Sequence, residues 1–525
     1  MLRTAKKLTA ILLCMLMLFS AFMPAASAVS AENYPVVYIA GYGANIFAEK
    51  GNINSEVYYP TGADVGAIVK EAIEPCLKEL AKALVTDDFD NYCDALYNSI
   101  HPIYENLSLA PDGTPKDNSG RVENLEAPVF LEYNKFSAGE ETFPYDWRLS
   151  PETSAAELDL FIDKMLADTG AEKVNVVARC LGGNVLSSYF QNYSENAQQK
   201  ISKAVFLIPS TEGINVIGAL FAGKINIAAE KFDTYVEELL KYKQIIEDDA
   251  AKEMLTVMIT IFEQIKLLDL GVGALQKLID EIKDNLVPRL IRRSYGSFPS
   301  FWAMVPHEYL EDALAFVYNT PELKEEYKGT IEKVRSYHDN VQLNARNCIK
   351  NLDGKIDIKV ISKYNIPLLP VFEDCNATSD GTAETYLTSF GATTADFGKT
   401  LSESYLASVK EENKKYISPD EKVDASTCVL PQKTWFVKNN YHDNFPATVD
   451  AMMNTMFLTE NMDITTDSRY PQFLEDVNNG EALVPVIGKD EEKPDSNSLL
   501  GILNTIKRFF TALVALIKGL FENAE

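Results

Sequence analysis

Residues 173–190 read KVNVVARCLGGNVLSSYF. The β-branched run from Val174 to Ala178 turns through Cys180 into two glycines and then into residues that favour a helix. Strand, tight turn and helix in this order form the layout of a nucleophile elbow, which needs small residues two positions before and two positions after the reactive side chain. Ala178 and Gly182 occupy those positions, so Cys180 stands where the nucleophile would be.

Two interpretations of Cys180 follow from this stretch. In the first, the start of the helix directs its free N–H groups at Cys180, which favours a thiolate or an oxyanion. In the second, Cys180 is a buried cysteine in an ordinary strand-to-helix turn. The stretch alone leaves both open, and the rest of the chain has to separate them.

Further apolar runs predict core strands on both sides of the elbow. They cover Pro35–Tyr42, Lys203–Pro209, Lys355–Lys363 and Thr434–Lys438, the last strand that the sequence indicates clearly, and a helix over Ser154–Leu166 precedes the elbow strand. Strand, helix, strand order implies parallel pairing with a right-handed crossover. We therefore expect an α/β protein with an α/β-hydrolase fold, in which helices flank a mostly parallel sheet and a helical cap is inserted.

Helical patterns interrupt the strands at about residues 61–111 and 214–345, and we expect insertions there. The second insertion, which includes Phe232–Ile246 and Ala251–Leu267, would form a cap or lid. The hydrolase domain is expected over residues 29–487. A charged linker over residues 488–498 and an amphipathic helix over residues 499–525 follow. That helix either lies on a membrane surface or packs back onto its own domain.

The amino-terminal end predicts export. Residues 1–28 combine a basic start, an apolar stretch from Leu8 to Phe22 and the small-x-small sequence Ala26-Ser27-Ala28, which is typical of a secretory signal peptide. We expect cleavage near Ala28 and a secreted or cell-envelope location. Loss of this basic segment makes the net charge of −27 still more negative, and such a surface repels nucleic acid.

Export also makes disulfides conceivable. With Cys180 free, local order suggests pairing of Cys76 with Cys93 and of Cys375 with Cys428, which leaves Cys348 over. A disulfide at Cys180 that closes the site until it is reduced is a further alternative. No cluster of His and Cys has metal-ligand spacing, so we expect no metal site and no cofactor.

A thiol nucleophile needs a base to take its proton and an acid to orient that base. In α/β-hydrolases the three groups follow in the order nucleophile, acid, base, each on a loop after a core strand. Cys180, Asp380 and His442 have this order, and among four histidines His442 alone follows a late strand. A turn aspartate and a surface-loop histidine are the alternatives, and Asp374 is the other candidate acid.

The strand at Pro35–Tyr42 ends in the glycine-containing loop Gly41-Tyr42-Gly43. An α/β-hydrolase places one oxyanion-hole donor on such a loop and the other just after the nucleophile. The backbone N–H groups of Tyr42 and Leu181 are therefore the candidate donors. The alternative is a simple loop after a core strand.

Several motifs together resemble the lecithin:cholesterol acyltransferase family. They are YDWR at 145–148, ARCLGG at 178–183, RSYGSFPSFWAMVP at 293–306 and SDGT at 379–382, followed by the late histidine. The resemblance runs in order from about Pro35 to His442. This chain differs in having Cys180 where the family has serine, Ala178 for the first elbow glycine, and Ala40-Gly41 for the family's Pro-Gly.

The resemblance implies an acyl-enzyme mechanism on lipid-like esters, with Cys180 as nucleophile, Asp380 as acid and His442 as base. It also implies that Asp146, Trp147 and Arg148 are structural or shape the acyl site, which makes them candidate substrate-site residues.

The sequence thus predicts an exported lipid-type acyltransferase or acyl-ester hydrolase with a thioester intermediate at Cys180. A thioester can pass its acyl group to an alcohol, an amine or water, so the cysteine is compatible with both reactions. The alternative is a non-catalytic envelope protein that uses a hydrolase scaffold to bind lipid or a partner. Its lipid binding would be unaffected by Cys180→Ala.

Overall fold

The computed structural model describes residues 34–43, 45–59, 75–76, 78–83, 85–121, 140–228, 231–245, 271–477 and 480–488. The predicted signal peptide, the cap helix predicted over Ala251–Leu267, the linker beyond Gly488 and the amphipathic helix over 499–525 lie outside these residues. The described residues as far as Val486 belong to one compact unit. Within the described part of the chain, no helix is both long enough and apolar enough to cross a membrane.

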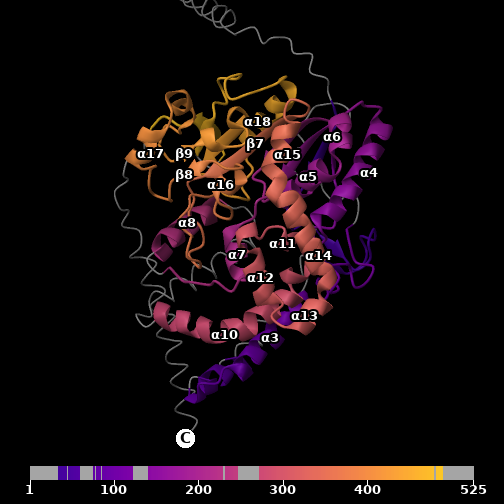
Figure 1. The fold of residues 1–525 in the computed structure, drawn as a ribbon, viewed down its shortest axis with the longest axis vertical. Coiled ribbons are helices and arrows are strands. Elements are labelled where there is room, and N and C mark those ends of the chain that lie inside the picture. Colours follow the sequence, from indigo (N-terminus) through magenta and orange to yellow (C-terminus); the bar gives the residue numbers. More distant parts are fainter. Residues whose placement is uncertain are drawn as a thin grey trace, which may run out of the picture. The chain divides into compact units, whose positions relative to one another are not determined.

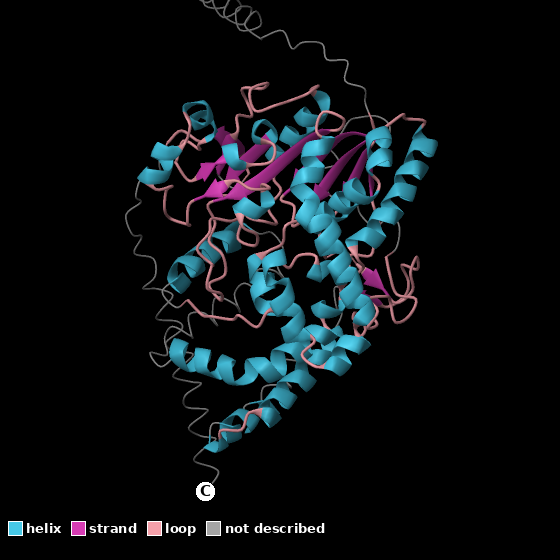
Figure 2. Cartoon of the chain, viewed as in Figure 1, coloured by secondary structure: helices cyan, strands magenta, loops and turns pink. Residues whose placement is uncertain are grey.

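An eight-stranded sheet runs through this unit (Figure 2). Its order is β12 (Ala482–Pro485), β11 (Phe473–Val477), β10 (Thr434–Lys438), β7 (Asp357–Tyr364), β6 (Ile201–Leu207), β5 (Val174–Arg179), β1 (Val36–Ile39) and β4 (Glu140–Thr142). All neighbours pair in parallel except β11 and β12, which are antiparallel. This confirms the mostly parallel sheet flanked by helices.

Strands β4, β11 and β12 were not predicted, and the last two follow Lys438, where the clearly indicated strands end. The reason lies in their composition. Strand β4 reads EET, and β11 reads FLEDV with two carboxylates in its carboxyl-terminal half. Strands β4 and β12 are the two edge strands and β11 lies next to β12, so these strands do not need the continuous apolar runs of the central parallel strands.

Alternate residues of the strands pack against helices on opposite faces. Val37 and Ile39 lie in one core cluster, which includes α4 (Pro151–Thr169), α5 (Leu181–Asn192) and α15 (Ala345–Leu352). Val36 and Tyr38 lie in a second cluster with α18 (Ala447–Leu458). A shift of one residue would exchange the two sets, so burial on both faces fixes the register of β1.

Helix α4 extends the predicted helix Ser154–Leu166 at both ends. Ser150 caps its start, because the hydroxyl accepts the N–H of Glu152 at 3.3 Å. Gly170, with a φ of 70°, ends it in the left-handed conformation that glycine adopts at helix ends.

The described residues between β6 and β7 form helices and turns, in the region where the cap was expected. Other α-helices of the described part are α3 (Asp90–Tyr104), α6 (Ser194–Lys200), α7 (Asn215–Phe221), α8 (Phe232–Ile245), α10 (Gly271–Arg293), α11 (Pro299–Trp302), α12 (Leu310–Val317), α13 (Pro321–Glu326), α14 (Lys328–Ser336), α16 (Thr385–Thr388) and α17 (Glu403–Ser408). Helix α3 lies along α10 (Figure 1), and Arg289 and Asp94 join the two at 2.8 Å. Two short antiparallel pairs, β2 (Ile46–Phe47) with β3 (Val57–Tyr59) and β8 (Thr393–Thr394) with β9 (Val423–Asp424), lie outside the main sheet.

Candidate active site

Cys180 stands at the turn between β5 and α5 with a φ of 50° and a ψ of −119°. A positive φ in a residue with a side chain is strained, and such residues gather at functional sites. The turn is tight because α5 packs directly on β1. A Cβ added at Gly182 would lie 2.2 Å from the carbonyl oxygen of Ile39, so the predicted need for a small residue there has a steric cause.

The loop after β1 passes beside the thiol. A Cβ added at Gly41 would lie 3.1 Å from the Cβ and 3.8 Å from the Sγ of Cys180. Tyr42 follows in this loop, and Leu181 is the first residue of α5, where an N–H has no acceptor within its own helix. Both candidate oxyanion donors therefore belong to segments that border Cys180.

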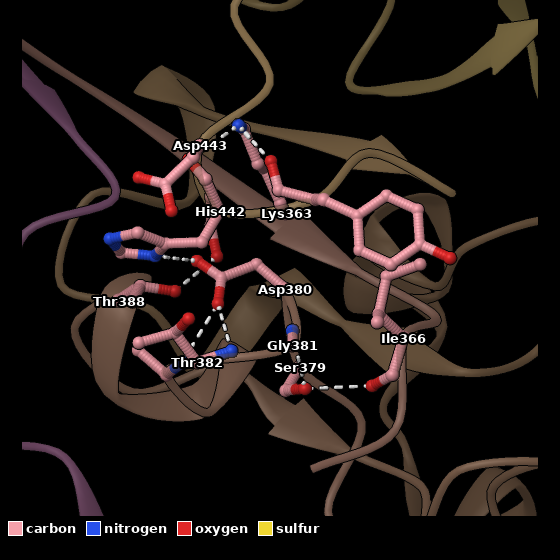
Figure 3. A network of polar contacts seen from close by, with 12 residues as sticks. Lys363, Ile366, Ser379, Asp380, Gly381, Thr382, Thr388, His442 and Asp443 are labelled. Carbon is pink, nitrogen blue, oxygen red and sulfur yellow. Dashed lines mark hydrogen bonds and ion pairs between the residues drawn. The ribbon is translucent and has the colours of Figure 1, made fainter. Parts of the chain in front are cut away.

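Asp380 and His442 lie together at the carboxyl ends of the neighbouring strands β7 and β10 (Figure 3). The Nδ1 atom of His442 is 2.7 Å from Oδ2 of Asp380, and the backbone N–H of His442 donates to the Asp380 carbonyl at 2.8 Å. The other carboxylate oxygen of Asp380 accepts the N–H groups of Thr382 at 2.9 Å and Ala383 at 2.8 Å. The acid is thus held by its own loop and bonded to the candidate base.

The three candidate catalytic side chains are buried and coupled electrostatically. Burial alone would raise the pKa of the Cys180 thiol, but the charge of His442, a hydrogen bond with His442 and the charge of Arg179 outweigh it and leave the pKa below its ordinary value. Burial alone would lower the pKa of His442, but Asp380 and Cys180 raise it above its ordinary value. Burial opposes ionisation of Asp380, yet His442 keeps the pKa of that carboxyl below its ordinary value. The arrangement favours a thiolate beside an imidazolium.

A cavity of about 180 Å³ borders His442 on the side of α8. It is lined by Tyr235, Glu238, Leu239, Tyr242, Ile366, Pro367, Asp380, Gly381, Thr382, Tyr441, His442 and Asp443. Tyr441 links this helix to the candidate base, because its hydroxyl donates to the Glu238 carbonyl at 2.8 Å and its ring stacks on Tyr242 at 4.5 Å. A helix of the predicted cap therefore contacts the residue next to His442.

Aromatic side chains surround the ring of Tyr42, which is 37% exposed. The ring centroid lies 4.8 Å from Trp147, 5.2 Å from Phe301 and 5.6 Å from Tyr59, and the Tyr42 and Tyr295 hydroxyl oxygens are 3.3 Å apart. Two of the motifs singled out in the sequence, at 145–148 and 293–306, thus meet at the loop that borders Cys180.

Asp146 and Arg148 form a buried ion pair, with Nη2 of Arg148 at 2.7 Å from Oδ2 of Asp146. The guanidinium also donates to the carbonyl of Leu107 at 3.0 Å and to the hydroxyl of Ser119 at 3.2 Å. These contacts give both residues a structural position. Of the three candidate substrate-site residues, Trp147 is the one whose contact with Tyr42 brings it to the site.

The six cysteines of the described part are all free. The predicted pairing of Cys76 with Cys93 and of Cys375 with Cys428 is therefore wrong, and Cys180 is not in a disulfide in this structure. Cys375 and Cys428 belong to different core clusters, and the Sγ of Cys375 instead accepts from Nζ of Lys231 at 3.4 Å. In the described residues, no group of three or more His, Cys, Asp or Glu side chains could hold a metal ion.

Sequence reasoning missed four residues around the candidate base: Arg179, Lys363, Asp443 and Phe445. Arg179 and Asp443 form an ion pair at 2.7 Å, and Lys363 donates to carbonyls of the His442 loop. The sequence held one indication of two of them, because Arg179 directly precedes Cys180 and Asp443 directly follows His442. The other candidate acid, Asp374, lines a different cavity together with Lys224 and Tyr309.

Comparison with known proteins agrees with the fold. Residues 133–246 match the family model described as lecithin:cholesterol acyltransferase (LCAT), a stretch that holds the elbow but neither Asp380 nor His442. No curated protein matches the chain. Among solved structures, the chain is similar to one titled "The crystal structure of Tle4-Tli4 complex", with 15% identity and a TM-score of 0.18. The similarity covers 36% of this chain and 48% of that chain, so this chain spans less than half of that chain's length. The match over residues 133–246 supports an LCAT-like family, and together with the mostly parallel sheet it supports an α/β-hydrolase fold.

Proposed function

We propose that the protein transfers or hydrolyses the acyl group of a lipid-like ester through a thioester at Cys180. The observation that carries this proposal is the Asp380–His442 pair beside a thiol on a strained elbow, where the charge of His442 lowers the pKa of that thiol. The match to the acyltransferase family supports the class of reaction. The cysteine in place of serine makes the intermediate a thioester rather than an ester.

In the first half of the reaction His442 holds the proton of the Cys180 thiol. Because Nδ1 of His442 bonds to Asp380, the Nε2 atom is the one that exchanges this proton. The thiolate attacks the acyl carbonyl carbon, a C–S bond forms, and the carbonyl electron pair moves onto oxygen. The N–H groups of Tyr42 and Leu181 would stabilise this oxyanion.

The intermediate then collapses. The ester C–O bond breaks, and the leaving alkoxide takes the proton from Nε2 of His442. In the second half of the reaction an alcohol or water gives its proton to His442 and attacks the thioester carbonyl. The C–S bond breaks and Cys180 leaves as a thiolate. Asp380 stays ionised throughout and keeps the imidazole in the orientation that each step requires.

Intact-mass measurement tests the thioester directly. The full chain is incubated with p-nitrophenyl palmitate and quenched in acid, and we expect a mass increase of one palmitoyl group located on Cys180. Cys180→Ala should abolish it, and His442→Gln should slow its formation. Cys348→Ala is the matched control, because Cys348 is free and half-buried.

Two outcomes would overturn the proposal. The first is an unmodified wild-type protein, and the second is an adduct that persists in Cys180→Ala. An unmodified protein that still binds phospholipid vesicles equally well with Cys180→Ala would favour the non-catalytic lipid-binding alternative.

The location of the enzyme is also part of the proposal. Amino-terminal sequencing of the protein recovered from the culture medium or cell envelope should find a new terminus near Val29. Deletion of residues 489–525 should move the protein from the membrane fraction to the soluble fraction if the predicted amphipathic helix contacts lipid. An intact Met1, or no redistribution, would contradict the respective part.

A further inference from the structure

An ion pair joins the two loops that carry the thiol and the base. Nη2 of Arg179 lies 2.7 Å from Oδ1 of Asp443, and these residues are the immediate neighbours of Cys180 and His442. The Asp443 side chain is 65% exposed and that of Arg179 25% exposed. Exposed pairs of this kind contribute at most about 1 kcal/mol to folding stability. The Arg179–Asp443 pair therefore has a small effect on folding stability, and its position beside Cys180 and His442 suggests a role in the site.

Lys363, at the end of β7, holds the same loop from beneath. Its side chain is fully buried, and its ammonium donates to the carbonyl oxygens of Tyr441 at 2.7 Å, His442 at 3.2 Å and Asn444 at 2.8 Å. Figure 3 shows the lysine reaching the segment that carries His442 and Asp443. An ammonium has three N–H donors, so this backbone segment is bonded as fully as one lysine allows.

The ring of Phe445 contacts both Arg179 and Lys363. The guanidinium carbon of Arg179 is 4.0 Å from the centroid of its ring, and Nζ of Lys363 is 4.1 Å from it. Each contact is in the range of a cation–π interaction. The aromatic ring thus joins Arg179 on β5 to Lys363 on β7, and all of these contacts converge on residues 441–445.

We propose that Arg179, Lys363, Asp443 and Phe445 form a clamp that positions the imidazole of His442 against the thiol of Cys180. We call these four side chains the His442 clamp. They are positioning residues, which act through His442. The proposal deepens the function proposed above and rests on it for the role of the thiol, but its test uses a reaction that needs no acyl substrate.

The charges around Cys180 let one substitution separate positioning from simple electrostatics. The groups that face the thiol are His442 and Asp443 from the loop after β10, Arg179 from its own strand, Tyr38 from β1 and Tyr145. The negative charge of Asp443 raises the pKa of Cys180, whereas Arg179 and His442 lower it. If Asp443 acted only through its negative charge, its removal would therefore lower the pKa of the Cys180 thiol.

The clamp predicts the opposite for Asp443→Ala. Without this ion pair, the loop holds His442 less firmly at the thiol, and part of the favourable effect of the His442 charge on the thiol is lost. Peptide mass spectrometry measures the alkylation of Cys180 by iodoacetamide as a function of pH. We expect the midpoint of this pH profile to rise by about one unit. We also expect kcat with p-nitrophenyl palmitate to fall about tenfold while KM changes less than twofold.

Controls are available on the same chain. Asp168→Ala removes another exposed carboxylate that pairs with a lysine, at 3.0 Å from Lys164, and should move neither the midpoint nor kcat. Combination of Asp443→Ala with Arg179→Gln should lower kcat no further than Arg179→Gln alone, because both remove the same link.

Lys363→Met tests the second arm of the clamp. It leaves three carbonyls without their donor and should raise the alkylation midpoint as Asp443→Ala does. Lys359→Met is the matched control, since Lys359 is a second buried lysine on β7 but is bonded to Asp357 at 2.5 Å. It should change thermal stability without moving the midpoint.

The alkylation midpoint decides the clamp, and the acyl adduct decides the proposed function. A midpoint that falls or stays constant in Asp443→Ala overturns the clamp, even if wild type forms the thioester. A midpoint that rises supports the clamp, and an absent thioester would then reject only the proposed function.

Discussion

Asp380→Asn is the substitution for which the structure makes the sharpest prediction, because it changes one atom and leaves the shape of the side chain intact. One oxygen of Asp380 accepts two backbone N–H groups, from Thr382 and Ala383, and the other faces Nδ1 of His442. An amide has one acceptor oxygen and one NH₂ donor. If its oxygen keeps the two backbone bonds, its NH₂ must face the imidazole.

This orientation forces the wrong tautomer. Nδ1 of His442 must then accept a hydrogen bond, so the ring proton moves to Nε2, which can no longer take the proton of the Cys180 thiol. The opposite orientation would place the NH₂ against two N–H donors and leave both unsatisfied, at a cost of about 1–3 kcal/mol each. The same change in a serine-protease triad lowers kcat about 10⁴-fold.

We expect kcat to fall about 10³- to 10⁴-fold, which corresponds to about 4–5.5 kcal/mol in the activation free energy. The lower end of this range, a 10³-fold fall, is smaller than the 10⁴-fold fall in the serine protease, because a thiol ionises more readily than a hydroxyl and depends less on its base. In wild type the negative charge of Asp380 raises the pKa of His442 and so keeps the imidazolium beside the thiol. Loss of that charge should also move the alkylation midpoint of Cys180 to higher pH.

Steady-state kinetics with p-nitrophenyl palmitate and the pH profile of alkylation measure these two effects. Asp374→Asn is the control, because Asp374 is the other candidate acid and lines a separate cavity. Circular dichroism checks that both variants are folded. A kcat within tenfold of wild type, or equal losses in the two variants, would refute the assignment of Asp380 as the acid.

Three other predictions concern stability, the cap and pH. Asp146→Asn leaves the charge of Arg148 buried without its partner and should destabilise the protein by about 3–5 kcal/mol in urea unfolding; a change below 1 kcal/mol would contradict this. Tyr441→Phe removes a hydroxyl bond to α8 that contributes about 0.5–1.5 kcal/mol, so amide exchange in residues 232–245 should accelerate, and unchanged exchange would count against that contact. The pKa of Cys180 lies below its ordinary value, whereas burial raises the pKa of Cys428 to about 12. As the pH increases, Cys180 therefore becomes a thiolate before Cys428 does, and iodoacetamide at pH 7 should label Cys180 first. Equal labelling of the two cysteines would reject the lowered pKa of Cys180.

The centre of the sheet could be predicted because its strands are buried on both faces and contain short apolar runs. Strands β5 to β7 and β10 are short buried runs, and the order of elbow, acid and base along the chain matches the order of their strands. Strand β11, which lies next to the edge strand β12, could not be predicted in this way, because Glu475 and Asp476 break its apolar run. Composition reveals a strand only where both faces need apolar side chains.

The candidate site shows the same division. Asp380 and His442 could be selected from chain order and the scarcity of histidine, and the structure brings them within 2.7 Å. The contacts of Lys363 could not be predicted, because they depend on the path of the loop after β10. One signal was present in the sequence: Lys363 stands two residues after Ile361 in a strand, so it shares the buried face of that residue. A lysine on such a face needs acceptors nearby.

The close packing of α5 on β1 makes the two small positions of the elbow unequal. Ala178 is buried in the core, so the strand side already accommodates a methyl group. Gly182 has no space for one, because the carbonyl oxygens of Ile39 and Ala40 would lie at 2.2 Å and 2.8 Å from its Cβ. A library of variants should therefore tolerate alanine or serine at 178 and return only glycine at 182. The helix side of the elbow, and not the strand side, sets the limit on how this turn can diverge.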